Sequence, residues 1–170
     1  MGLKFFMTKL LLFILFLLSN HLLATSLPNF SMQDQYENHL STKNLIGFPT
    51  VFLGCEKNDL ELCRKNGRKL YWKMQNLLWK DSTKVKFVAY LNLQDSNSLI
   101  EKFISDSKKM DYESIYLDRK GELAIGLKSD FVFLRIYNSQ GKEILKEYAN
   151  PITDDDVKKV YDILKKEIKN

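Results

Sequence analysis

The sequence predicts an α/β fold in which a central mixed sheet is covered by helices on both faces. Segments with strand and helix patterns alternate between residues 46 and 104, as in parallel strands joined by crossover helices. Two strand-like segments then flank a short polar loop, which is typical of an antiparallel hairpin. An amphipathic helix follows this hairpin, so the sequence indicates three layers with the sheet in the middle.

The first central strand and the longest helix are expected to follow each other directly. Residues 46–54 form a short apolar segment rich in β-formers, which predicts a strand buried on both faces. Asn58 and Glu61 are spaced as a capping box, and the helix that they open is expected to end near Trp79. Its predicted buried stripe recurs at helical spacing and consists of Leu60, Cys63, Gly67, Leu70, Met74 and Leu77.

A second strand and a shorter helix complete the alternating part. Residues 85–93 show an alternating pattern of side-chain polarity and are rich in β-formers, so this segment predicts a strand. Ser96 or Asn97 is expected to open the next helix, and residues 114–117 are a short strand candidate before a turn at 118–121. The apolar residues expected on one side of this helix are Leu99, Ile100, Phe103 and Ile104.

The carboxyl-terminal part carries the most explicit local signals. Residues 131–137 and 143–148 flank a polar loop that ends in Gly141, which predicts an antiparallel hairpin. Thr153 is expected to cap the last helix, and three aspartates follow at its electropositive end. The apolar stripe expected on this helix is Val157, Val160, Tyr161, Leu164 and Ile168.

The amino-terminal segment has the pattern of a secretion signal. Lys4 and Lys9 lie before an unbroken apolar segment, residues 10–18. As a helix this segment covers only about 14 Å, which is too short to span a membrane. We therefore expect residues 1–24 to be a signal peptide, residues 25–170 to be one exported domain, and the protein to be periplasmic or secreted. An uncleaved amino-terminal membrane anchor is the alternative, because the residues before Ala24 match a cleavage site only loosely.

Composition disfavours several classes of function. The formal net charge is +5, and the charges are interleaved in the sequence, so a nucleic-acid partner is not expected. His39 is the only histidine outside the signal segment, which disfavours a metal site and a Ser-His-Asp triad. No cofactor is expected. Four basic residues of the long helix are expected to be solvated: Lys65, Arg68, Lys69 and Lys73. Its aromatic residues Tyr71, Trp72 and Trp79 fit either a partner surface or packing within the protein.

Two parts of the chain resemble a known group of proteins. Pro28 and Phe30, the following segment with Asp34, and the Gly47-Phe48-Pro49 sequence before the first central strand resemble the peroxiredoxin and thiol-disulfide reductase group. That group has lysine where Phe48 stands. Residues 137–144 are similar to the hairpin that precedes its last helix. The resemblance covers residues 27–168 and implies a thioredoxin-like three-layer sandwich. Residues 63–67 and 117–122 resemble an exported branch whose activity is often unassigned.

The two cysteines are the candidate functional residues. Cys55 lies at the carboxyl end of the first central strand, where α/β sheets collect reactive groups, and Cys63 lies eight residues later on the long helix. The resemblance implies a thiol-based redox role in which Cys55 and Cys63 exchange with protein thiols. A structural disulfide and a pair of buried thiols remain open, because the sequence does not fix the distance between the two Cα atoms.

A peroxiredoxin-like activity is a further implication of the resemblance. It would make Cys63 the residue that reacts with a peroxide substrate, with Arg64 or Arg68 as the residue that stabilises its thiolate. The sequence departs from that pattern, because Glu56 and Leu60 stand where the family has proline and threonine.

It also departs from the reductase pattern, because no proline lies between Pro49 and Pro151 to form the cis-proline found before the hairpin. A non-catalytic binding or scaffold module, with a structural disulfide or buried thiols, is therefore the alternative function.

Overall fold

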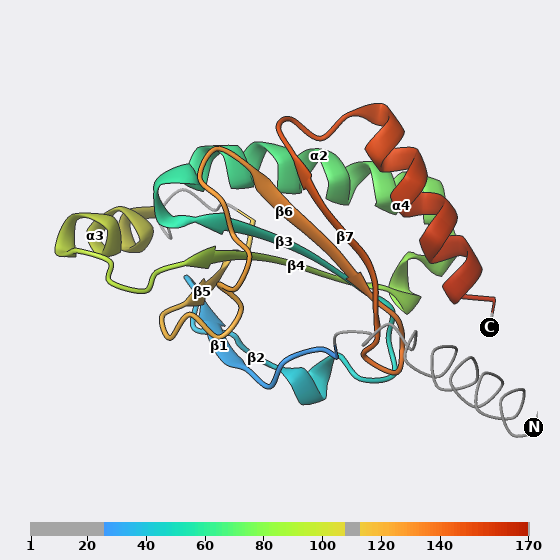
Figure 1. The fold of residues 1–170 in the computed structure, drawn as a ribbon, viewed down its shortest axis with the longest axis horizontal. Helices are drawn as coiled ribbons and strands as arrows, with labels where there is room; N and C mark the ends of the chain where they lie inside the picture. Colours follow the sequence, from blue (N-terminus) through green and yellow to red (C-terminus); the bar gives the residue numbers. More distant parts are fainter. Residues whose placement is uncertain (1–25, 108–112, 170) are drawn as a thin grey trace, which may run out of the picture.

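The computed structural model describes residues 26–107 and 113–169 (Figure 1). The expected signal peptide, residues 1–24, lies outside the described residues, and so does its alternative as an anchor. The strands are β1 (Ser31–Asp34), β2 (His39–Ser41), β3 (Thr50–Glu56), β4 (Lys86–Asn92), β5 (Tyr116–Asp118), β6 (Val132–Tyr137) and β7 (Glu143–Ala149). The helices are α2 (Leu60–Leu78), α3 (Ser98–Ser107) and α4 (Asp154–Glu167), with the short 3₁₀ helices η1 (Thr42–Asn44), η2 (Lys57–Asp59) and η3 (Trp79–Lys84).

The strands of the described residues form one mixed sheet in the order β2-β1-β5-β4-β3-β6-β7. Strand β3 lies inside it, parallel to β4 and antiparallel to β6. Strands β4 and β5 are also parallel, whereas β6 and β7 form the predicted antiparallel hairpin. The α/β class and the mixed sheet predicted from the sequence are confirmed.

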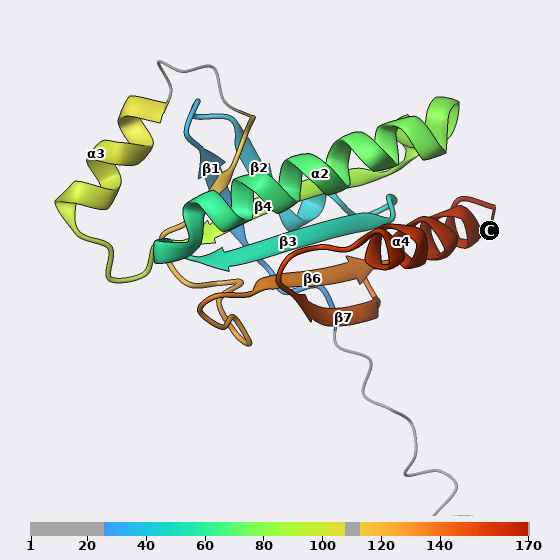
Figure 2. The same ribbon diagram turned by 90° about the horizontal axis from the view of Figure 1, so that it is seen from above.

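Each face of the sheet has its own apolar cluster. Helices α2 and α4 lie side by side on one face (Figures 1 and 2), and their buried residues pack on the inward side chains of β3, β4 and β6. The opposite face carries an aromatic cluster. Three segments outside the central strands contribute to it: Phe30 comes from the segment before β1, Leu45 directly follows η1, and Leu123 lies in the 121–127 loop. Because both faces of β3 are covered, every residue from Thr50 to Cys55 is buried.

The β3–α2 unit differs in detail from the prediction. Strand β3 begins at Thr50, since Gly47 has a left-handed φ of 95° and Pro49 follows it. Helix α2 begins at Leu60 with Asp59 as its N-cap residue, so the expected capping box of Asn58 and Glu61 is wrong.

The expected stripes of α2 and α3 were also partly wrong. Leu77 is 46% exposed, and Leu78, four residues after buried Met74, takes its place in the core. On α3, Ile104 is buried whereas Leu99 and Phe103 are exposed.

The carboxyl-terminal elements follow their local signals closely. The Thr153 hydroxyl accepts a hydrogen bond from the Asp156 amide at the start of α4, as its capping role requires. Gly141 has a φ of 77° in the turn between β6 and β7. Val157, Val160 and Leu164 are buried. The predicted hairpin and last helix are therefore confirmed.

A buried polar contact organises the aromatic cluster. The Tyr90 hydroxyl donates to the Leu123 carbonyl at 3.0 Å and accepts from the Arg135 guanidinium at 2.8 Å. The Tyr90 ring crosses β3 at Gly54, where a Cβ would lie 2.2 Å from Cζ of that ring. Gly54 is therefore required by the close approach of Tyr90. Burial raises the pKa of Tyr137 to about 12, and that of Tyr90 in the same direction, so both hydroxyls stay neutral.

Candidate functional site

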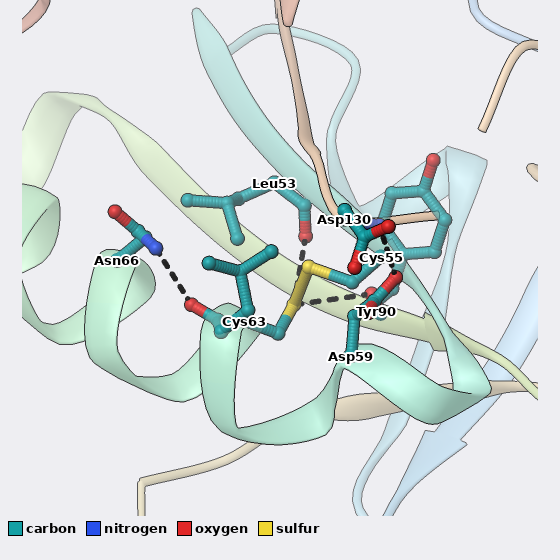
Figure 3. Close-up of a disulfide and its surroundings, with 8 residues drawn as sticks. Leu53, Cys55, Asp59, Cys63, Asn66, Tyr90 and Asp130 are labelled. Atoms are coloured by element: carbon teal, nitrogen blue, oxygen red, sulfur yellow. Dashed lines mark hydrogen bonds between the residues drawn. A yellow bond between two sulfur atoms is a disulfide. The ribbon is translucent and has the colours of Figure 1, made fainter. Parts of the chain in front are cut away.

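Cys55 and Cys63 form a disulfide between β3 and α2 (Figure 3). Their Cα atoms are 5.9 Å apart, which is within the range that a disulfide spans. The sequence left open whether the two cysteines are bonded or are a pair of buried thiols, and the prediction of unbonded thiols is wrong. Both cysteines are 0% exposed, so the bridge lies fully inside the protein.

The two elements hold the sulfurs in different surroundings. Cys55 is the penultimate residue of β3 and lies opposite Leu91 of β4. Cys63 is the fourth residue of α2, and its Sγ lies 3.7 Å from the Tyr90 carbonyl oxygen and 4.0 Å from the Leu53 carbonyl oxygen. The bridge therefore ties the carboxyl end of a central strand to the first turn of the longest helix.

The turn between the two cysteines, which we call the closing turn (Lys57–Asp59), is attached to two other loops. The Lys57 ammonium donates to the carbonyl oxygens of Gln94 and Asp95, at 3.1 and 2.9 Å. On the other side, the Asp59 carboxylate accepts a hydrogen bond from the Asp130 amide at 3.1 Å. Figure 3 shows Asp59 and Asp130 beside the disulfide. The closing turn is thus held by side-chain hydrogen bonds to a loop on each side.

The loop before β6 lacks the proline of ordinary reductases, as the sequence indicated. Asp130 stands there with a left-handed φ of 66°, and its carbonyl accepts from the Asn150 side chain. The cis peptide bond of the described chain is Asn150–Pro151, which lies beyond the hairpin. Asp130 is therefore held through its backbone by the side chains of Asp59 and Asn150.

The side chain of Arg64, the third candidate site residue, is only 9% exposed on α2. Its guanidinium pairs with the Glu61 carboxylate at 3.2 Å and lies 5.8 Å from the centre of the Phe103 ring. The structure thus brings Cys55 and Cys63 together, and it places Arg64 with Glu61 and Phe103. A catalytic role for any of the three stays a prediction.

Sequence reasoning missed Asn66, which anchors this region. Asn66 is 1% exposed on the buried face of α2. Its amide nitrogen donates to the Leu62 carbonyl at 2.8 Å, and its amide oxygen accepts from the Ile152 amide at 2.7 Å. A signal was present, because Asn66 lies between Cys63 and Leu70 on an otherwise apolar stripe, where a polar side chain needs a buried partner.

Two further properties bound the chemistry of the described residues. Residues 26–107 and 113–169 hold no group of three or more His, Cys, Asp and Glu side chains placed to bind a metal ion. No helix within these ranges is both long and apolar enough to cross a bilayer.

A groove of about 330 Å³ runs between α2 and the sheet. Among the described residues, those that line this groove include Leu53, Tyr71 and Phe87 but neither cysteine. The groove therefore does not lead directly to the disulfide.

No protein-family model and no curated protein matches the sequence. Solved structures are similar to it at low identity. The thioredoxin domain of a thiol-disulfide oxidoreductase from Bacteroides vulgatus is 17% identical, with a TM-score of 0.55, over 83% of this chain and 96% of that one. ScoI from Bradyrhizobium japonicum, solved with copper bound, is 13% identical, with a TM-score of 0.55, over 84% and 99%. An exposed lipoprotein thioredoxin from Streptococcus pneumoniae is 10% identical, with a TM-score of 0.54, over 80% and 99%.

Proposed function

Since the chain has a thioredoxin-like fold, we propose that it is an exported thiol-disulfide redox protein that exchanges the Cys55–Cys63 disulfide with thiols of partner proteins. One observation carries this proposal: the disulfide joins the carboxyl end of β3 to the first turn of α2. In α/β sheets, reactive groups collect at the carboxyl ends of the strands, where the connections diverge. This position at the edge of the sheet supports a role for the bridge as a two-electron centre.

The reaction that fits this centre is a pair of thiol-disulfide exchanges. A partner thiolate attacks one sulfur of the bridge, the Cys55–Cys63 bond breaks, and a mixed disulfide forms while the other sulfur leaves as a thiolate. The second thiolate of the partner then attacks the partner's sulfur in the mixed disulfide. This forms the partner's disulfide and releases the remaining cysteine of the pair as a thiolate. Two electrons and two protons pass from the partner, which becomes a disulfide, to Cys55 and Cys63. The reverse exchange reoxidises them.

Burial makes this exchange depend on a local opening. An attacking thiolate must approach a sulfur along the S–S axis, and both cysteines are 0% exposed. The closing turn is attached mainly by the side-chain contacts of Lys57 and Asp59, and such segments open at a smaller free energy than the sheet. We infer that the turn opens before a partner reacts.

Export is part of the same proposal. The amino-terminal pattern at residues 1–24 supports it, and disulfides persist in oxidising compartments such as the periplasm or the exterior. One structural neighbour is an exposed lipoprotein. An uncleaved amino-terminal anchor would place the same domain at a membrane and leave the proposed chemistry unchanged.

The second candidate function is a non-catalytic binding or scaffold module in which the disulfide only stabilises the fold. The complete burial of both cysteines favours it. Peroxide as a substrate has less support, because peroxide reduction needs a free, accessible thiolate at Cys63, which is bonded and buried here.

An assay of disulfide transfer separates the two candidates. The reduced wild-type protein is expected to reduce a protein disulfide such as that of insulin, whereas Cys55→Ser and Cys63→Ser each lose the activity to background, since both sulfurs are needed to complete a cycle. Circular dichroism checks that the variants remain folded. Equal rates in the wild type and in a folded variant would reject the redox proposal and leave the scaffold candidate.

A further inference from the structure

The outer face of α2 gathers basic residues around an exposed tryptophan. We call Lys65, Arg68, Lys69, Trp72 and Lys73 the basic face. Lys65, Lys69 and Trp72 follow each other at intervals of four and three, so they lie along one line of the helix. All five residues line one shallow hollow of about 550 Å³ on the protein surface, in which Glu61 is the one carboxylate of the described lining.

Neighbouring acids neutralise this face only in part. Arg68 pairs with Glu113 at 2.6 Å, and Lys69 lies 3.3 Å from Asp154. The Lys73 ammonium is 3.9 Å from the same Asp154 carboxylate, which therefore serves two cations. Lys65 has no ion pair within the described part of the chain. The face keeps an excess of positive charge.

Exposed indoles extend this surface towards the carboxyl end of α2. Trp72 is 54% exposed, and Trp79, at the start of η3, is 72% exposed. Lys73 and Lys80 directly follow the two tryptophans in the sequence. Lysine and tryptophan together are the side chains that proteins place at the boundary between water and lipid headgroups.

We propose that the basic face docks on an anionic lipid surface. Anionic headgroups attract clustered lysines and arginines on a helix, and the amphipathic rings of Trp72 and Trp79 enter the headgroup layer. Acidic polypeptides would satisfy the charges, but they would not require two indoles held in water beside them. This surface is separate from the disulfide, so the inference is independent of the proposed redox role.

The two tryptophans are the only ones in the chain, which makes the binding directly observable. We expect the protein to bind phosphatidylglycerol vesicles at low salt with a blue shift of its tryptophan emission, and to bind phosphatidylcholine vesicles at least tenfold more weakly. Binding to the anionic vesicles is expected to weaken as salt is raised, because screening acts on exposed charges. Co-sedimentation gives the partition coefficient.

Matched charge reversals locate the surface. The variant Lys65→Glu/Lys80→Glu is expected to bind anionic vesicles about 25-fold or more weakly, at about fivefold for each lysine lost. The control Lys43→Glu/Lys142→Glu makes the same change in net charge at exposed positions of η1 and of the β6–β7 turn, away from α2, and should bind within about twofold to threefold of the wild type. Both variants alter exposed lysines and should stay folded.

Three results would overturn the proposal. These are equal binding to both kinds of vesicle, equal losses in the two double variants, and tighter binding to soluble polyglutamate or to duplex DNA than to anionic vesicles. The last would identify the basic face as a site for an acidic polymer.

Discussion

At the scale of single residues, two glycines of the β3–α2 unit have opposite requirements. Gly54 faces the ring of Tyr90, with which any Cβ would overlap at 2.2 Å. At Gly67, a Cβ would meet the Ala89 Cβ at 3.8 Å and the Leu53 Cδ2 at 4.0 Å, which are ordinary contacts. The sequence placed Gly67 on the buried stripe of α2, but the position that requires a glycine is Gly54, since the requirement comes from a side chain on another strand.

Alanine substitutions test this difference directly. Gly54→Ala is expected to lower the free energy of unfolding by about 3 kcal/mol, because the Tyr90 ring must leave its hydrogen bonds with Leu123 and Arg135. Gly67→Ala is expected to raise it by about 0.5–1 kcal/mol, since alanine has the better helix propensity. Urea unfolding followed by circular dichroism measures both. A Gly54→Ala protein as stable as the wild type would contradict the packing described here.

Asn66 shows a second kind of residue that a sequence pattern finds only in part. Its place on an apolar stripe could be noticed from the sequence. Its partner, the Ile152 amide, is 86 residues away and comes from the loop before α4. Long-range partners of this kind are not encoded in local spacing, so the contact became visible only in the structure.

At the scale of elements, the local signals were reliable where they were complete within a few residues. Thr153 with Asp156 and the turn at Gly141 specify α4 and the hairpin from their own neighbourhoods. The start of α2 was less predictable. Its N-cap is Asp59, whose carboxylate is engaged by the amide of Asp130 across the sheet edge. A tertiary contact therefore replaced the capping box that the sequence suggested.

The closing turn is the element that should control the accessibility of the disulfide. Lys57→Ala/Asp59→Ala removes its side-chain contacts with Gln94, Asp95 and Asp130. Each lost hydrogen bond contributes about 1 kcal/mol, so the rate of reduction by dithiothreitol is expected to rise about tenfold or more. Quenched alkylation and mass spectrometry follow this rate.

The matched control is Lys158→Ala/Asp162→Ala, which removes the same residue types from exposed positions of α4. Its rate of reduction should equal that of the wild type. Equal rates in both double variants would show that another segment of the protein limits access to the sulfurs.

At the scale of the whole molecule, the order of strands and helices from β3 to α4 was predictable because these elements carry local sequence signals, whereas β1 and β2 were not predicted from the sequence pattern. The sequence also placed Cys55 at the end of the first central strand and Cys63 on the helix that follows it. It could not decide whether they were bonded, since this depends on the path of Lys57–Asp59 between them. The 5.9 Å between their Cα atoms and their complete burial are properties of the assembled fold.

The redox equilibrium of the Cys55–Cys63 pair tests the proposed function most directly. The folded protein is equilibrated in glutathione buffers of defined potential, quenched with acid and alkylated, and the two states are counted by mass spectrometry. A redox centre predicts a midpoint between about −270 and −120 mV, the range of catalytic thiol-disulfide oxidoreductases, with a fold that persists in both states. A pair that stays oxidised below about −300 mV, or a protein that unfolds on reduction, would show a structural disulfide and contradict the proposal.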